Sequence, residues 1–358
     1  MSKHSLFSPL KLKSFELQNR IIVSPMCQYS ADEGFANNWH LVHLGQFAIG
    51  RAGAVIQEAT AVSPEGRISY GDLGIWQDAQ VEKYKEITEF IKSQGSVPGI
   101  QLAHAGRKAS TDLPWLTRKQ FSPDEQNGWQ TIAPSPIPYH ETEHPPIELS
   151  IDQINNIILS FQAATERAVK AGYQIIEIHA AHGYLIHQFL SPLTNLRKDQ
   201  YGGSFENRIR FLLEIIDAMR VRITDQQSLW IRLSATDWAE GGWDVSQTIK
   251  LIQLLKSNGV EVADISSGGA VSHQKILVES GYQVPFANEV KKQTNIITGT
   301  VGLITSAKQA QDILERDAAD FILLGREFLR QPHLVFNWAK ELKQDIKWPN
   351  QYERAKTE

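Results

Sequence analysis

Short apolar runs alternate with longer amphipathic stretches along most of the chain. The apolar runs predict strands, and the apolar positions of the intervening stretches recur with helical spacing. Apolar runs of this kind are typical of parallel strands that are covered on both faces. We expect strands at residues 21–25, 54–59, 97–103, 175–179, 229–233, 261–266, 295–300 and 320–324, followed by helices at about 38–52, 79–94, 151–171, 205–223, 245–258, 283–293, 306–317 and 328–342.

Polar residues mark three of the expected helix starts. Asp78 can cap the helix that begins near residue 79, and Ser150 can cap the helix at 151 with Gln153 as its capping-box partner. Ser204 opens the next helix, and Glu206 lies in its first turn, where the helix dipole favours negative charge.

Eight β/α units can form either a closed barrel or an open, doubly wound sheet. An open sheet that binds a dinucleotide should carry G-x-G-x-x-G after its first strand, but MCQYSADEGFANN follows Pro25. Eight units match the barrel count. We therefore predict one (β/α)8 TIM-barrel domain over 1–358, with an N-terminal cap, long βα loops and a C-terminal tail from about 343. Trp115 and Trp129 indicate that the 105–149 excursion is an ordered loop.

Composition narrows the classes of function. Of the 358 residues, 36 are Lys or Arg and 40 are Asp or Glu, so the basic excess typical of nucleic-acid binding is missing. No run of about 18 apolar residues predicts a membrane helix, and the first twenty residues contain no apolar signal-peptide core. With Cys27 as the one cysteine, no intrachain disulfide can form. We expect a cytoplasmic protein with no nucleic-acid or membrane partner.

Glycines after the last two strands form the best candidate phosphate site. Gly299 and Gly302 follow strand seven, and Gly325 and Arg326 follow strand eight. Barrel enzymes often bind phosphate at these two loops, where glycine lets backbone N–H groups approach an anion and Arg adds charge. Surface turn glycines with a solvated Arg are the alternative. A phosphate site without a dinucleotide fingerprint indicates a mononucleotide such as FMN.

Arg232 lies within an expected strand. Period-two alternation places it on the same face as Trp230, toward the barrel interior. A buried charge there needs a partner. Either it forms an ion pair with a neighbouring carboxylate, or it lies beside a cofactor that gains negative charge on reduction, with Gln101 supplying amide contacts.

The end of strand four carries His179, His182 and Tyr184. Two histidines three residues apart can bind zinc, but no H-E-x-x-H motif accompanies them, and we expect no metal. They can also be structural histidines, or donors that bind a substrate oxygen beside a tyrosine proton donor. With Cys27 as nucleophile they would make a Cys/His hydrolase, so a hydrolase or a metal enzyme is the alternative function.

A set of motifs resembles the Old Yellow Enzyme family of FMN-dependent ene-reductases. The similarity covers about residues 5–354 and is strongest to the bacterial branch of xenobiotic reductases and thermophilic-like enzymes. The motifs are SPMCQY (24–29), EATAVSPEGR (58–67), QLAHAGRK (101–108), EIHAAHGYL (177–185), YGGSFENRIRF (201–211), TGTVG (298–302) and LGRE (324–327).

The resemblance implies an NADPH dehydrogenase with FMN at the carboxyl ends of the strands. NADPH or NADH would give a hydride to flavin N5 and leave, and an activated alkene would then take that hydride in a ping-pong reaction. His179 and His182 would hold the substrate carbonyl, Tyr184 would protonate its α-carbon, Tyr29 would contact it, and Cys27 would tune the flavin. The implied FMN contacts are Ser24, Pro25, Met26, Cys27, Ala59, Gln101 and Arg232 for the ring, and Gly302, Gly325 and Arg326 for the phosphate.

The C-terminal tail also resembles thermophilic-like members. In those enzymes an arginine reaches into the active site of a neighbouring subunit, and Arg354 holds that place here. The resemblance therefore implies a homo-oligomer, a dimer or a tetramer, with Arg354 as a substrate-binding residue. A solvated tail arginine is the alternative.

Overall fold

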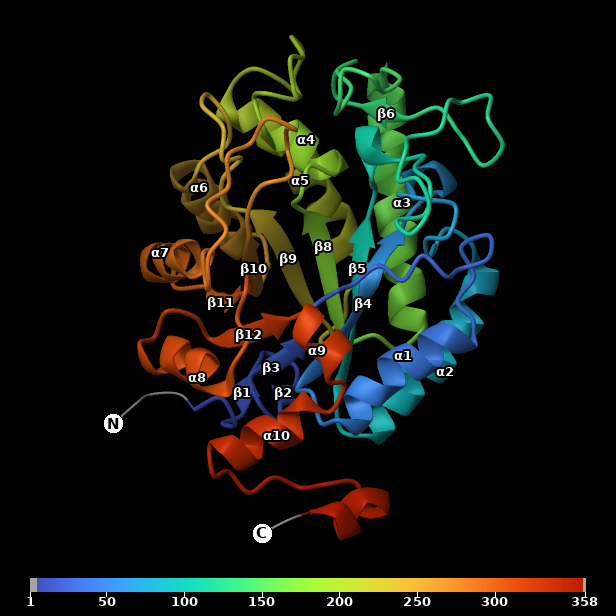
Figure 1. Cartoon of the computed structure of the whole chain (residues 1–358). Helices are drawn as coiled ribbons and strands as arrows, with labels where there is room; N and C mark the ends of the chain where they lie inside the picture. Colours follow the sequence, from blue (N-terminus) through green and yellow to red (C-terminus); the bar gives the residue numbers. More distant parts are fainter. Residues whose placement is uncertain (1–4, 357–358) are drawn as a thin grey trace.

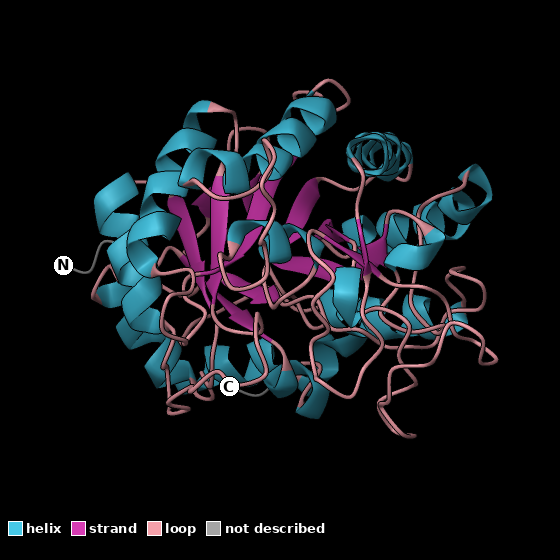
Figure 2. Cartoon of the chain, turned by 90° about the horizontal axis from the view of Figure 1, so that it is seen from above, coloured by secondary structure: helices cyan, strands magenta, loops and turns pink. Residues whose placement is uncertain are grey.

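Eight parallel strands close into a barrel in the computed structural model, which describes residues 5–356 (Figures 1 and 2). The strands follow the chain around the barrel and all pair in parallel. The predicted (β/α)8 fold is confirmed; strand boundaries differ by at most two residues, and helix boundaries by at most three apart from the last predicted helix. The barrel strands are β3 (Ile21–Val23), β4 (Ala54–Ala61), β5 (Val97–Ala103), β8 (Ile175–Ala180), β9 (Ser228–Ser234), β10 (Val262–Ser266), β11 (Ile297–Thr300) and β12 (Phe321–Leu324).

Helices surround the barrel, as Figure 2 shows from above. The prediction of one helix over 328–342 is wrong, because the chain breaks at Gln331, directly before Pro332. Proline forces the preceding residue out of the helical region. The helices are α1 (Asn38–Ile49), α2 (Val81–Ser93), α3 (Ile151–Lys170), α4 (Leu185–Leu190), α5 (Phe205–Arg220), α6 (Val245–Ser257), α7 (Val284–Thr294), α8 (Ala307–Glu315), α9 (Arg326–Arg330) and α10 (Leu334–Glu341).

Two of the three predicted helix caps are confirmed. The Ser150 side chain accepts from the backbone N–H of Gln153, which completes a capping box, and Ser204 caps α5. Asp78 is not a cap. It begins a short 3-10 turn ahead of α2, and its carboxylate pairs with Arg167 at 2.7 Å.

Period-two alternation divides the barrel interior into layers. At the amino ends of the strands, inward apolar side chains such as Trp230 and Phe321 pack into one cluster with the hairpin of β1 (Leu10–Lys11) and β2 (Glu16–Leu17). Arg232 has the same parity as Trp230 and lies one layer higher, as predicted. The hairpin closes the floor of the barrel, so polar groups collect only toward the carboxyl ends.

The long loop and the tail lie at opposite ends of the barrel (Figure 1). The loop carries β6 (Ile132–Ala133) and β7 (Ile147–Glu148), beyond the carboxyl ends of the strands. The tail ends in a 3-10 helix, Asn350–Ala355, and packs on α10, where Trp348 stacks on Phe336 at 4.2 Å between ring centroids. Over residues 5–356, every helix is too short or too polar to cross a lipid bilayer.

Candidate active site

A cavity of about 350 Å³ opens at the carboxyl ends of the strands. His182 lines it, together with residues from the ends of β3, β9, β11 and β12. Six of the residues predicted to hold the cofactor come together here from distant parts of the sequence: Ser24, Met26, Arg232, Gly302, Gly325 and Arg326.

Gly302, Gly325 and Arg326 form the outer end of this cavity. Gly302 has a φ of +117°, and a Cβ atom there would lie 2.8 Å from Gln283 Nε2, so the position requires glycine. The prediction for Gly299 is wrong. This glycine lies within β11, where a Cβ atom would lie 2.3 Å from the Phe321 ring, so its role is packing inside the barrel.

Arg232 both forms an ion pair with a neighbouring carboxylate and lies beside the cavity, the two positions that its sequence left open. Its Nε atom pairs with the buried carboxylate of Asp264 at 2.6 Å, and its side chain donates to Ser24 Oγ at 2.8 Å. It also lines the cavity. The neighbouring carboxylate holds the guanidinium in place while the charge stays within reach of a ligand.

A β-bulge aims Ala59 and Gln101 at the same interior. The register of β4 on β5 shifts between Gln57 and Ala59, which pairs Ala59 with Gln101. A bulge reverses the inward and outward alternation that follows it. Glu58 therefore faces away, where its carboxylate accepts the backbone N–H of Gln28 at 2.8 Å.

Three of the four rings predicted to contact substrate, those of His179, His182 and Tyr184, lie together. The His179 ring lies edge-on to His182 at 5.2 Å and to Tyr184 at 4.9 Å between centroids. His182 Nε2 lies 2.7 Å from Ser266 Oγ, and the backbone N–H of Ala181 donates to His179 Nδ1 at 3.4 Å. These contacts fix both imidazoles at the top of β8.

A buried pair, His187 and Asp237, supports the turn that carries these rings through hydrogen bonds. His182 has a φ of +59°, uncommon for a residue with a side chain. The next amide, that of Gly183, donates to His187 Nδ1 at 2.9 Å, and His187 Nε2 lies 2.8 Å from Asp237 Oδ1. Both His187 and Asp237 are buried. The pair holds a strained turn at a functional position.

Burial determines the protonation of the three rings. It lowers the pKa of His179 and His182 well below 6.5, and nearby positive charge such as Arg232 lowers both further. Burial raises the pKa of Tyr184 well above 10. At neutral pH the imidazoles are therefore uncharged, and the phenol keeps its proton.

The same environment argues against a nucleophilic Cys27. Burial, Asp72 and Glu58 raise the pKa of its thiol well above 9. A catalytic cysteine needs a lowered pKa, because the thiolate is the nucleophile. Tyr29 lies next to it and packs edge-on against Trp115, with ring centroids 6.2 Å apart. The hydrolase alternative therefore lacks its activated nucleophile.

The metal alternative finds no support in geometry. Among residues 5–356, three or more His, Cys, Asp or Glu side chains never group in a way that could hold a metal ion.

Lys108 belongs to the site, although the sequence did not single it out. Its Nζ donates to the backbone oxygen of His182 at 2.9 Å and lies 5.3 Å from the centre of the Tyr184 ring. Burial and the adjacent Arg107 lower the pKa of Lys108 to about 8. Only the fold brings Lys108 to the histidines, because η3 (Gly106–Lys108) follows β5 in the sequence, whereas His182 follows β8.

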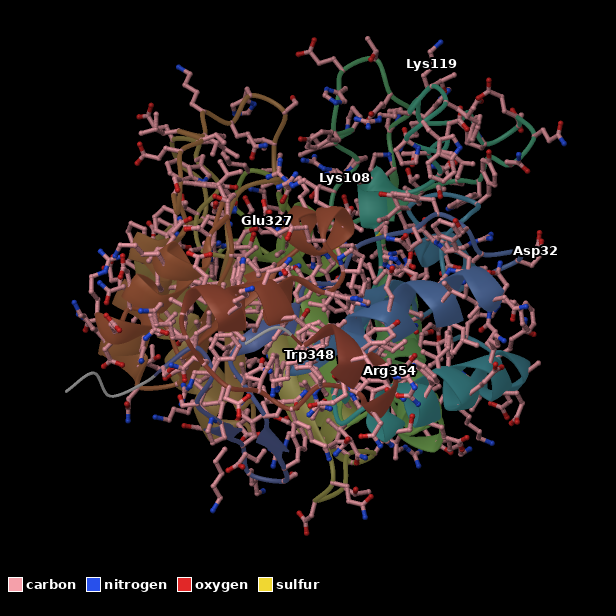
Figure 3. The ribbon with its side chains drawn as sticks, turned by 60° about the horizontal axis from the view of Figure 1, so that its bottom comes forward. Asp32, Lys108, Lys119, Glu327, Trp348 and Arg354 are labelled. Atoms are coloured by element: carbon pink, nitrogen blue, oxygen red, sulfur yellow. The ribbon has the colours of Figure 1, made fainter. Side chains whose placement is uncertain are left out.

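Eight of the predicted site residues do not line this cavity: Pro25, Cys27, Tyr29, Ala59, Gln101, His179, Tyr184 and Arg354. Pro25 is half-buried between Ser24 and Met26 without lining it. Arg354 is exposed on the tail, near Trp348 and far from the long loop that carries Lys119 (Figure 3). Within one chain, Arg354 does not join the other site residues, so its role stays a prediction about an assembly.

The residues of the cavity fit FMN. Arg232 stands at the inner end, where the polar edge of the flavin ring would need a positive charge. Gly302 and Gly325 allow close backbone approach at the outer end, and Arg326 adds the charge that a phosphate needs. Gln101 is buried between these strands and can present an amide to the ring.

Comparisons with known proteins give the same picture. The family model described as NADH:flavin oxidoreductase / NADH oxidase matches residues 5–345. An NADPH dehydrogenase of Bacillus pumilus (strain SAFR-032) is 47% identical over 98% of both chains. Morphinone reductase superposes with a TM-score of 0.78 at 30% identity, covering 97% of this chain and 91% of its own. The old yellow enzyme homologue of Zymomonas mobilis gives 0.76 at 26% identity, over 96% and 94%.

Proposed function

Since the chain belongs to the NADH:flavin oxidoreductase / NADH oxidase family, we propose that it is an ene-reductase that reduces activated C=C bonds. It is a flavin-dependent oxidoreductase with FMN as cofactor and a nicotinamide reductant. The proposal adds the second substrate, an α,β-unsaturated carbonyl compound or a related activated alkene. Bound FMN supplies the two-electron hydride chemistry that side chains cannot perform.

The cluster of His179, His182 and Tyr184 carries this proposal. An activated alkene needs hydrogen-bond donors at its carbonyl oxygen and a proton for its α-carbon. Two neutral imidazoles and a protonated phenol lie within about one ring diameter of each other, and His182 lines the cavity that fits FMN.

The hydrogen bonds of the imidazoles support a donor role. His179 accepts a backbone N–H at Nδ1, so its proton lies on Nε2. His182 contacts the Ser266 hydroxyl through Nε2. The Ser266 hydroxyl has one proton and also lies 3.2 Å from Gln283 Oε1, to which it can donate. The donor role of His182 requires that this proton points to His182 Nε2 instead, which places the ring proton of His182 on Nδ1. Each ring then keeps one N–H for a substrate oxygen, and neither imidazole has to carry charge.

Tyr184 is suited to donate a proton to the α-carbon of the substrate rather than to act as a phenolate. Its raised pKa keeps the phenol protonated across neutral pH. Its proton can be replaced from solvent after each turnover. We include in the proposal that the protein is a homo-oligomer in which Arg354 reaches the substrate site of a neighbouring subunit.

The test separates the two half-reactions. The purified protein, loaded with FMN, is mixed anaerobically with NADPH and then with 2-cyclohexenone while the flavin absorbance is followed. We expect bleaching with NADPH and recovery with the enone. Recovery with oxygen alone would keep the flavin and refute the alkene substrate class.

Tyr184→Phe sharpens this test. Loss of the proton donor should slow the enone step by roughly 10²- to 10⁴-fold and leave the NADPH step unchanged. Tyr201→Phe is the matched control, because it removes a tyrosine hydroxyl that donates to Glu214 at 2.8 Å, away from the cavity. Equal losses in both steps for Tyr184→Phe would contradict its role as proton donor.

A further inference from the structure

Four polar side chains form one layer inside the barrel, directly above the apolar floor. They lie on the consecutive strands β5, β8, β9 and β10, and each is at most 5% exposed. Gln101 is paired with Glu177 in the strand register, and Arg232 is paired with Asp264. Only Gln101 and Arg232 have a role in the proposed function, so the two carboxyl groups are unexplained.

Glu177 is bonded on one oxygen only. Its Oε1 accepts from Gln101 Nε2 at 2.7 Å, whereas Oε2 is buried without a hydrogen-bond partner. The amide nitrogen of Gln101 is therefore engaged inside the protein. Its carbonyl oxygen is the atom that remains to accept an N–H of a ligand.

The charges of the layer do not balance if both acids are ionised. Arg232 on β9 and Asp264 on β10 act electrostatically on Glu177, whose register partners, Gln101 on β5 and Trp230 on β9, are both uncharged. Arg232 contacts Asp264 directly at 2.6 Å, which favours the ionised form of that acid. A second buried carboxylate would have no cation in contact with it. Such a site retains a proton.

We propose that Glu177 is a positioning residue of the flavin site: its Oε1 fixes the orientation of the Gln101 amide, and its Oε2 carries the proton that lets two carboxyl groups share one arginine. The inference rests on the proposed function for the identity of the ligand. Burial and Asp264 raise the pKa of Glu177 to about 8. Above that pH, one more negative charge would lie beside Arg232.

The proton itself can be tested without cofactor. Infrared spectra of the full chain, with and without ¹³C-labelled glutamate, should contain the carbonyl band of a buried protonated acid at pH 7. The part of the band that disappears near pH 8 should be missing from Glu177→Gln; burial also raises the pKa of Glu58, whose band should be common to both proteins. Absence of the part that disappears near pH 8 from the wild-type protein would refute the proposal, even if the variant fails to fold.

The link to the flavin needs the midpoint potential of bound FMN as a function of pH. Negative charge on the reduced cofactor would raise the pKa of Glu177. Above about pH 8, where Glu177 is ionised in the oxidised protein, two-electron reduction by a redox dye should therefore be accompanied by uptake of one additional proton at Glu177. The potential should fall more steeply there in the wild type, but not in Glu177→Gln. An identical pH profile in both proteins would overturn the proposal.

Two further variants separate position from charge. Glu177→Gln keeps an oxygen acceptor for Gln101, so its affinity for FMN should stay within about threefold, whereas Glu177→Leu should bind roughly tenfold more weakly. Asp264→Asn removes the like charge and should shift the pH break downward by about 1–3 units. Equal FMN affinities for the Gln and Leu variants would refute the positioning role. If the wild type binds no FMN, the proposed function fails, while the infrared band still reports on Glu177.

Discussion

Gly302→Ala should weaken FMN binding through two separate costs. The backbone of Gly302 has a φ of +117°, and an alanine in such a conformation costs about 1–2 kcal/mol. The new Cβ atom would also lie 2.8 Å from Gln283 Nε2. Gln283 would have to move, and its amide connects Val301 O at 3.1 Å with Ser267 Oγ at 2.7 Å. Loss of one such hydrogen bond adds about 1 kcal/mol.

The sum is about 2–3 kcal/mol if the free protein relaxes and must return to the glycine geometry on binding. At 1.4 kcal/mol for each factor of ten, the dissociation constant of FMN should rise by about 30- to 140-fold. The assay is a fluorescence titration of FMN with the apoprotein, together with urea unfolding of both forms.

Gly203→Ala is the matched control. Gly203 has a φ of +83°, and an added Cβ atom would meet nothing within 4 Å. In this variant only the backbone conformation is strained, and the strain lies away from the cavity. Its unfolding free energy should fall by about 1–2 kcal/mol while its affinity for FMN stays unchanged. Wild-type FMN affinity in Gly302→Ala would refute the assignment of this glycine to the cofactor site.

Two other substitutions test groups whose protonation the structure explains. Cys27→Ala should change the potential of the flavin without releasing FMN, as measured by dye equilibration; loss of FMN would indicate a structural thiol instead. Asp237→Asn should lower the unfolding free energy in urea at pH 7 by about 2–4 kcal/mol, because His187, Ser191 and the backbone of Trp243 all direct donors at this carboxylate. Burial alone would raise the pKa of Asp237, but His187 and these donors hold it below its ordinary value. The stabilisation by ionised Asp237 is therefore present above about pH 4 and is lost as the pH falls below that value. A change in the unfolding free energy of less than 0.5 kcal/mol in Asp237→Asn would contradict this account.

The alternation of side chains predicted much of the barrel. It predicted the eight β/α units and the inward direction of Arg232, which shares a face of its strand with Trp230. This prediction is possible because the alternation of side chains within a regular strand is a local property. Parity could equally have identified Glu177, which lies two residues before His179 on β8. Parity fails at the bulge in β4, where the shift after Gln57 depends on pairing with β5.

Other parts of the site depend on contacts between distant segments. Gln283 enters the cavity from the loop before α7, and no local pattern marks it. Lys108 reaches the His182 backbone although 74 residues separate the two in the sequence. Gly299 looked like a phosphate glycine from its place after a strand, yet the Phe321 ring of the next strand fills the space beside it.

One physical condition sets the chemistry of the whole site. The apolar floor and the surrounding strands bury much of the site, and this burial favours the uncharged form of its titratable groups. It leaves His179 neutral, keeps the proton on Tyr184 and holds Cys27 as a thiol. Arg232 supplies the positive charge of this layer and is in contact with Asp264. Neutral donors beside a paired cation favour negative charge that develops only during reaction, which the activated alkene of the proposed function would require.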